Sequence, residues 1–281
     1  MKKLFILLMF ICVSSFSLIA EHNNSSGENK PVEIKLSIGW TFGCYKETTF
    51  SNITQNIMSP KYQLEAKFNA GNFMHKIALD YYFSKPESAM TKTAVVYKNF
   101  DPFSGESYYE AFNSTLYFHK IQFQYDLNYK FIKNESFSLY AGGSFMCNAF
   151  LQFEHYPSIT GLISIGPSYE IMCKINGHNS ISFASSIPLL GYGVRPSYAG
   201  CDAKLMKYAE EDFLKILTLG SFLNLHNYQS IHFKFDYKVR ASEYFSTGLG
   251  LDFEYARIAV PKERPLYYVN GNFKTFVMIN F

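Results

Sequence analysis

Residues 117–131 read YFHKIQFQYDLNYKF, and this stretch decides the fold. Its odd positions carry apolar or aromatic residues and His119, while its even positions after Phe118 are all polar or charged. Successive side chains of a β-strand point to opposite faces, so the pattern predicts a long strand with one apolar and one polar face. The same alternation recurs at 32–43, 62–69, 231–240 and 245–256.

Two all-β architectures share this alternation: a soluble sandwich and a membrane barrel. Several predicted strands run for roughly 10 to 15 residues, whereas a sandwich strand has about 5 to 6 and a spanning strand needs about 9–11. The polar faces carry Gly and Ser beside their charges, as a tight barrel interior would. Tyr and Phe cluster near strand ends, as interfacial aromatic girdles do. The sequence therefore favours the barrel, with a secreted, soluble β-sandwich adhesin as the weaker alternative.

The N-terminus has the order of a secretory signal peptide. Lys2 and Lys3 come first, residues 4–13 form an apolar run, and residues 14–20 are small and mixed. This order predicts a cleaved signal peptide at 1–20, because the apolar run is short for an anchoring helix of about 20 residues. Residues 21–31 are polar and predict a disordered leader. Residues 32–281 then form one barrel domain.

Gly- and Asn-containing turns separate the strands by a few residues and predict sequential hairpins. The fold class is therefore an all-β, up-and-down antiparallel transmembrane β-barrel. Eleven strands are expected, at 32–43, 60–69, 73–83, 113–131, 137–150, 160–174, 180–190, 213–225, 230–240, 244–258 and 268–281. Bacterial single-chain barrels have even strand numbers, so we predict twelve, with 92–100 as the twelfth, or ten if two weak segments are loops. This count puts 193–212 on the periplasmic side, and the segment is long for a periplasmic turn. Either it forms a short plug or cap helix, or one strand has been miscounted.

The C-terminal segment 270–281 reads NGNFKTFVMINF and ends on an aromatic residue. Phe273, Val277, Ile279 and Phe281 share one face. The segment resembles the C-terminal assembly signal of Gram-negative outer-membrane β-barrel proteins. The resemblance covers the mature chain in pattern and implies location in the outer membrane, contact with its lipid, and insertion by the barrel-assembly machinery.

The polar faces of the strands are expected to line the lumen. Their charged members nearly balance in sign, which predicts either a network of ion pairs or a narrow pore with little charge preference. The predicted lumen residues are Glu33, Lys35, Glu65, Lys67, Lys76, Asp80, Lys120, Asp126, Lys130, Lys234, Asp236, Lys238, Arg240, Asp252 and Glu254.

Catalytic and ligand-binding signatures are weak. His119 with Ser114 and Asn113 is the one local set that suggests a Ser-His arrangement, but an interfacial His among aromatic residues explains it better. No Cys/His spacing predicts a metal, no Gly-rich loop predicts a nucleotide, and no cofactor or nucleic acid is expected. Cys44 and Cys201 are expected at loop bases, where an oxidising compartment permits a disulfide.

These observations favour a non-enzymatic outer-membrane barrel that acts as a narrow channel, a small-solute conduit or a structural surface protein. The alternative is a barrel hydrolase of lipid or peptide with its site at the outer rim.

The barrel prediction is tested by extraction. We expect the protein to stay with the membrane pellet after an alkaline wash and to show a heat-modifiable shift on gels, because a closed barrel keeps its shape in detergent until heated. A protein that washes off and shows no shift would instead be a soluble sandwich.

Overall fold

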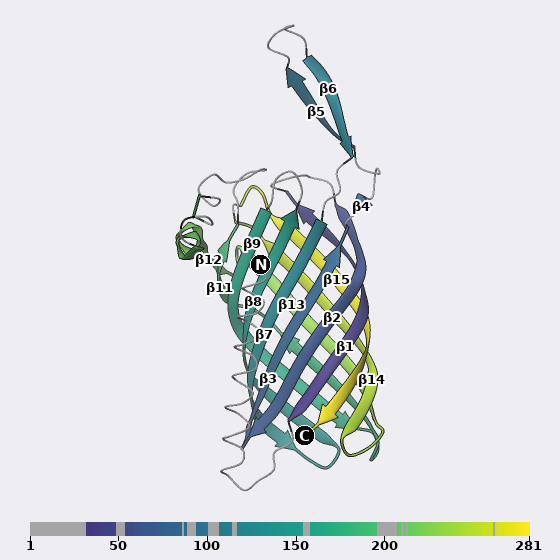
Figure 1. Cartoon of the computed structure of the whole chain (residues 1–281). Helices are drawn as coiled ribbons and strands as arrows, with labels where there is room; N and C mark the ends of the chain where they lie inside the picture. The colour runs from purple at the N-terminus through teal and green to yellow at the C-terminus, as the bar shows by residue number, and fades with distance from the viewer. Residues whose placement is uncertain are drawn as a thin grey trace.

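Ten antiparallel strands wind around one axis in the computed structural model (Figure 1). The structure describes residues 32–48, 54–85, 87–88, 94–100, 107–113, 117–153, 158–195, 207–208, 211, 213–260 and 262–281. The predicted signal peptide and leader, Ser114 and Cys201 lie outside these residues. The barrel strands are β1 (Glu33–Glu47), β2 (Gln55–Ala70), β3 (Phe73–Ser84), β7 (Tyr117–Lys133), β8 (Phe137–Phe153), β9 (Ser158–Lys174), β10 (Asn179–Ser186) with its continuation β11 (Leu190–Val194), β13 (Tyr228–Arg240), β14 (Phe245–Ile258) and β15 (Leu266–Asn280).

The sheet closes on itself. β1 pairs with β15, which brings the first and last strands together over the full length from Glu33↔Asn280 to Glu47↔Leu266. β10 pairs with β9 on one side and with β13 on the other, so the ring has no open edge there. The fold class predicted from the sequence is thus confirmed, and the strand number is ten, the smaller of the two predicted counts.

The barrel has two different ends. Short turns at 71–72, 134–136, 175–178 and 241–244 lie at the end that also holds Val32 and Phe281, whose backbones hydrogen-bond to each other. The longer connections join the strands at the opposite end. Short turns mark the periplasmic side of such barrels, so we name the two ends the periplasmic end and the outer end.

The apolar residues of the alternating pattern cover the outside of the wall. Leu36, Ile38, Trp40 and Phe42 on β1 are all exposed, while the residues between them face the lumen. The same holds on β14, where Leu249, Leu251 and Phe253 are exposed. An apolar exterior on a closed barrel is the arrangement that lipid requires, because every backbone polar group is already paired within the sheet.

A one-residue bulge divides the seventh barrel strand. Ser186 is opposite Ser168 and Leu190 is opposite Ile165, so four steps on one strand match three on its partner. Pro188 occupies the bulge, where its missing amide proton costs no ladder hydrogen bond. After the bulge, the even-numbered residues of this strand face outward instead of inward. Tyr192 therefore points away from the lumen, as does the residue opposite it, Ile163.

Two expected barrel strands are wrong. The described part of the predicted strand 92–100 does not enter the wall: β5 (Ala94–Phe100) pairs with β6 (Ser107–Asn113) in a separate two-stranded hairpin beyond the outer end, next to the short β4 (Glu87–Ser88) (Figure 1). Residues 213–225 form the 3₁₀ helix η1 (Phe213–Leu219) and the short strand β12 (Ser221–Asn224). The first error arose because the pattern detects a strand but does not show which strand it pairs with. The second arose because a short apolar stretch fits a strand and a helix equally well.

The conflict over 193–212 is settled by this correction. Without a full strand at 213–225, the connection from β11 to β13 falls at the outer end, where long loops belong. Its helical part is no plug. Ile216 packs against Val194, Tyr192, Tyr208 and Leu219, and Figure 1 shows this part beside the outside of the wall. Among the described residues, no helix is both long and apolar enough to cross a membrane.

Gly142 and Gly143 offer a test of the wall's tight interior. A Cβ on Gly142 would clash with the backbone oxygen of Leu127, whereas one on Gly143 would meet nothing closer than 3.9 Å. We expect Gly142→Ala to lower the free energy of unfolding by about 1–3 kcal/mol, the usual cost of overpacking. Urea unfolding in lipid vesicles measures this, and Gly143→Ala is the matched control. Equal stabilities would contradict the close approach of β7 and β8 at this level.

Candidate functional site: a lumen in three levels

Three kinds of side chain occupy three successive levels of the lumen. An apolar cluster fills the outer level, a network of buried charges crosses the middle, and a pocket lined by charged residues opens at the periplasmic end. Each level follows from which inward-facing positions of the strands carry aromatic, charged or small residues.

The first part of the network joins β2, β3, β14 and β15 around Asp252. Its carboxylate accepts from Lys274 Nζ at 2.6 Å and from Lys61 Nζ at 3.4 Å. Lys61 also pairs with Asp80 at 2.9 Å. Lys274, with 1% of its side-chain surface exposed, donates to Gln63 Oε1 at 2.9 Å as well. These residues satisfy one another, as buried charges must.

The second part lies nearer the periplasmic end. Glu170 on β9 accepts from Lys67 at 2.7 Å and from Lys76 at 2.9 Å, and Lys76 also pairs with Asp126 at 3.3 Å. β2 and β9 are separated by three strands on one side of the ring. The Lys67–Glu170 pair therefore spans the lumen rather than following the wall.

A third pair connects opposite walls. Lys120 on β7 donates to Glu254 on β14, and both side chains are buried. His232 Nε2 lies 3.6 Å from the same carboxylate. The Lys120 ammonium also lies over the rings of Tyr268 and Phe150, at 4.6 and 5.5 Å from their centroids. This pair therefore marks the boundary between the charged and the apolar levels.

The outer level is filled by a cluster that we call the apolar plug. It includes Phe118, Tyr82, Tyr268 and Leu223, each with no more than 1% of its surface exposed. The Tyr82 hydroxyl donates to the Tyr268 hydroxyl at 2.7 Å, so the buried polar ends are also satisfied. The other members are Tyr45, Ile57, Phe150, Leu162, Tyr228, Ala256, Ile258 and Leu266.

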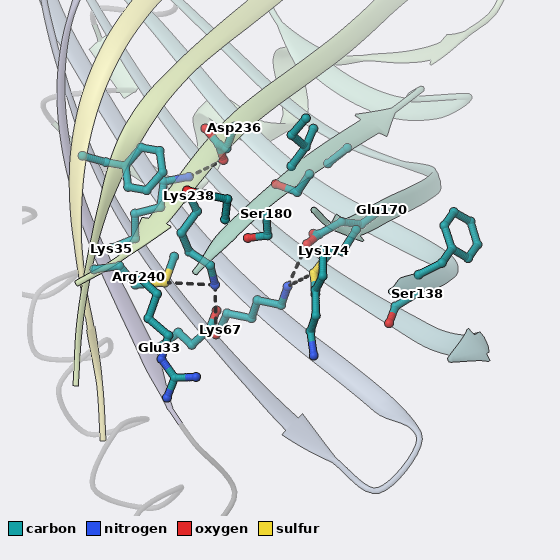
Figure 2. A pocket seen from close by; sticks show the side chains of 18 of the residues that line it. Glu33, Lys35, Lys67, Ser138, Glu170, Lys174, Ser180, Asp236, Lys238 and Arg240 are labelled. Carbon is teal, nitrogen blue, oxygen red and sulfur yellow. Dashed lines mark hydrogen bonds and ion pairs between the residues drawn. The ribbon is translucent and has the colours of Figure 1, made fainter. Parts of the chain in front are cut away.

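The periplasmic level is a cavity of about 410 Å³, which we call the periplasmic pocket. Figure 2 shows its charged lining converging from several strands, with Lys67 between Lys238 and Glu170. Lys35 pairs with Asp236 at 2.5 Å, and Lys238 pairs with Glu33 at 3.8 Å. The pocket lies at the end of the barrel that holds Val32 and Phe281.

The predicted lumen residues face the interior or its periplasmic mouth, and most of them enter the network. Glu33, Lys35, Glu65, Lys67, Lys120, Asp126, Asp236, Lys238, Asp252 and Glu254 all form ion pairs there. Lys130 lies 5.8 Å from the centroid of the Tyr140 ring, Arg240 donates to Ser242 O at the rim, and Lys234 is buried. Of the two predicted interiors, an ion-pair network is therefore what the structure contains.

Sequence reasoning missed three members of the network: Lys61, Glu170 and Lys274. The alternation already indicated two of them. Lys61 is an even number of residues from Lys67 and so shares its inward face, and Lys274 is adjacent to the outward-facing Phe273 and so faces inward. Glu170 lies within a predicted strand whose faces had not been assigned. Extending the assigned alternations to the strand ends would have found Lys61 and Lys274, and assigning the faces of 160–174 would have found Glu170.

The structure places His119 on the exterior face of the barrel, away from the lumen. Its ring lies against Phe83 and Tyr81, and its Nδ1 is 3.0 Å from the Tyr81 hydroxyl. Asn113 ends β6 in the outer hairpin. A different set, Ser230, His232 and Glu254, is buried inside. Both the serine hydroxyl (3.2 Å) and the carboxylate (3.6 Å) approach the same nitrogen, Nε2. A catalytic triad needs the acid on the other nitrogen.

The predicted assembly-signal residues lie on the exterior face of the barrel. Phe273, Val277, Ile279 and Phe281 are all exposed, on the strand that closes the barrel and at its end. Cys44, Cys147 and Cys173 carry free thiols. Among the described residues, no group of three or more His, Cys, Asp or Glu side chains could hold a metal ion.

Comparison with known proteins finds likeness in fold rather than in sequence. No family model matches, and no curated protein matches in sequence. The outer membrane protease OmpT from Escherichia coli superimposes with a TM-score of 0.60 at 5% identity, covering 91% of this chain and 99% of that one. Neisserial surface protein A has a TM-score of 0.38 at 6% identity, covering 89% of this chain and 97% of that one. The translocator domain of the autotransporter NalP from Neisseria meningitidis has a TM-score of 0.42 at 6% identity, covering 97% of this chain and 96% of that one. Both TM-scores are too low to carry an argument.

This chain therefore has the closed antiparallel fold of an outer-membrane β-barrel protein, with an apolar exterior. Identity at this level extends to the fold alone and carries no activity from one protein to the other.

The network around Asp252 provides a stability test. Asp252→Asn would leave Lys61 and Lys274 without their shared charge, and breaking a buried pair costs about 3–5 kcal/mol. We expect urea unfolding to show a loss of this size. Glu211→Gln is the control, because Glu211 pairs with Lys207 at 3.8 Å on the surface, where an ion pair contributes about 0–1 kcal/mol. A loss for Asp252→Asn no larger than the control's would mean that the network does not hold the walls together.

Proposed function

We propose that this protein is a non-conducting outer-membrane barrel that serves as a structural surface protein. The observation that carries the proposal is the filled lumen: the apolar plug occupies its outer level and cross-wall ion pairs occupy the middle. Ions moving along the axis would have to break the Lys120–Glu254 pair and then enter an apolar cluster. Both steps are costly, since a charge in an apolar site loses its hydration.

The outer end supports the surface role. The long connection from β3 to β7 contains the β5–β6 hairpin, which extends beyond the barrel mouth (Figure 1). A filled barrel supplies a rigid base for such a segment, and rigid scaffolds with functional loops are a common division of labour. The proposal is therefore that the wall anchors the protein and that the outer connections make its contacts.

A role as a rim hydrolase has less support. Among the described residues of the outer level, the inward-facing side chains are mainly those of the apolar plug. The buried Ser230–His232–Glu254 set lacks triad geometry, and His119 faces away from the lumen.

Insertion by the barrel-assembly machinery is part of the proposal. Phe273, Val277 and Ile279 lie on the exposed face of β15, and Phe281 follows at the end of the chain. A recognition segment has to remain accessible while the last strand pairs with the first, and this face meets that condition.

Planar bilayer recordings test the non-conducting state. We expect the protein to insert without discrete conductance steps. A variant in which Tyr82, Phe118, Tyr268, Lys120 and Glu254 are all Ala should conduct, because it removes both the plug's centre and the pair beneath it. The variant's fold is checked by its heat-modifiable gel shift. Discrete steps from the unaltered protein would overturn the proposal in favour of the channel.

A further inference from the structure

Lys234 differs from the other lysines in the middle of the lumen. It exposes only 9% of its surface, and its Nζ has no hydrogen-bond partner. By contrast, Lys61, Lys76, Lys120 and Lys274 each pair with at least one carboxylate. Burying an ammonium group without a hydrogen bond is costly, so an anion that reached Lys234 would supply an interaction that the described residues leave unmade.

The neighbours of Lys234 explain why it has no acid partner. Asp252 lies opposite it on β14, but that carboxylate already accepts from Lys274, Lys61 and Asn272. On the other side, the residue opposite Lys234 is Ala184 on β10, which offers no charge. Lys234 therefore interacts with Asp252 and Asp80 only at longer range, and none of the described residues gives its Nζ a hydrogen bond.

Lys234 and Ala184 both line the periplasmic pocket. The pocket carries seven cationic and five acidic side chains, so cations are in excess. Lys174 and Arg240 add exposed positive charge to its lining. An anion entering from the periplasm would therefore meet positive charge first at the rim and then at the inner wall.

The size and access of the cavity define the ligand. A volume of about 410 Å³ falls in the range of small-molecule sites, about 300–1,000 Å³. The cavity lies inside the barrel rather than on the lipid-facing wall, so the ligand is a free solute. A lysine ammonium pairs well with the oxygens of phosphate or carboxylate groups.

We propose that the periplasmic pocket binds a small free anion carrying a phosphate or carboxylate group, with Lys234 as its principal contact. This site is separate from the surface role proposed above and stands or falls independently of it.

Calorimetric titration of the purified, detergent-folded protein at low ionic strength tests the site. The probes are inorganic phosphate and succinate, and the tighter of the two assigns the anionic group. We expect saturable binding that Lys234→Met weakens at least tenfold, since it removes the charge and keeps the side-chain length. Lys262→Met is the control and should bind like the unaltered protein, because Lys262 is an exposed lysine in an outer turn.

Ala184→Asp provides a second variant that does not depend on removing the lysine. A carboxylate opposite Lys234 would act as an internal counterion and should also weaken binding at least tenfold while the heat-modifiable shift is retained. If Lys234→Met fails to fold, this variant decides. Absence of saturable binding by both probes, or unchanged binding in the folded variants, would overturn the proposal.

Discussion

The structure depends on one constraint: in lipid, each backbone N–H and C=O must find its partner within the chain. A sheet meets this condition by closing, and here the pairing of β1 with β15 completes the ring. Closure with ten strands leaves a narrow lumen, because barrels of about eight strands are already just wide enough to be filled by side chains. Every inward-facing residue must therefore either contact the opposite wall or leave space for water.

The narrow lumen explains why the charges form pairs across it. Lys120 and Glu254 come from opposite walls, as do Lys67 and Glu170 from well-separated strands. Buried pairs of this kind contribute little net stability compared with apolar packing, but they penalise any arrangement that separates them. Their main effect is to specify how the walls face each other. A strand shifted by one residue would place these charges in lipid.

Much of this architecture could be predicted from the sequence because period-two alternation reports the two faces of each strand directly. The lumen charges and the exposed apolar belt followed from it. The apolar plug did not, because Phe118, Tyr82 and Tyr268 are the same residue types that cover the lipid face, and parity alone had to distinguish them. The β5–β6 hairpin and η1 were misjudged for a related reason: alternation detects a strand but not whether it joins the ring. Ion pairing across the lumen depends on three-dimensional distance, which spacing along one strand does not contain.

The two ends of the lumen differ in chemistry. The outer level is filled by apolar side chains, while the periplasmic level holds a cavity whose lining has more cationic than acidic side chains. If interior residues merely filled space, charge and cavity would be distributed without regard to the two ends. Instead, the cavity and the one mid-lumen lysine described above as lacking a carboxylate partner occur together, on the side open to periplasmic solutes. A barrel of this kind can present its loops outside and still sense or hold an anion inside, because the network between the two ends separates them.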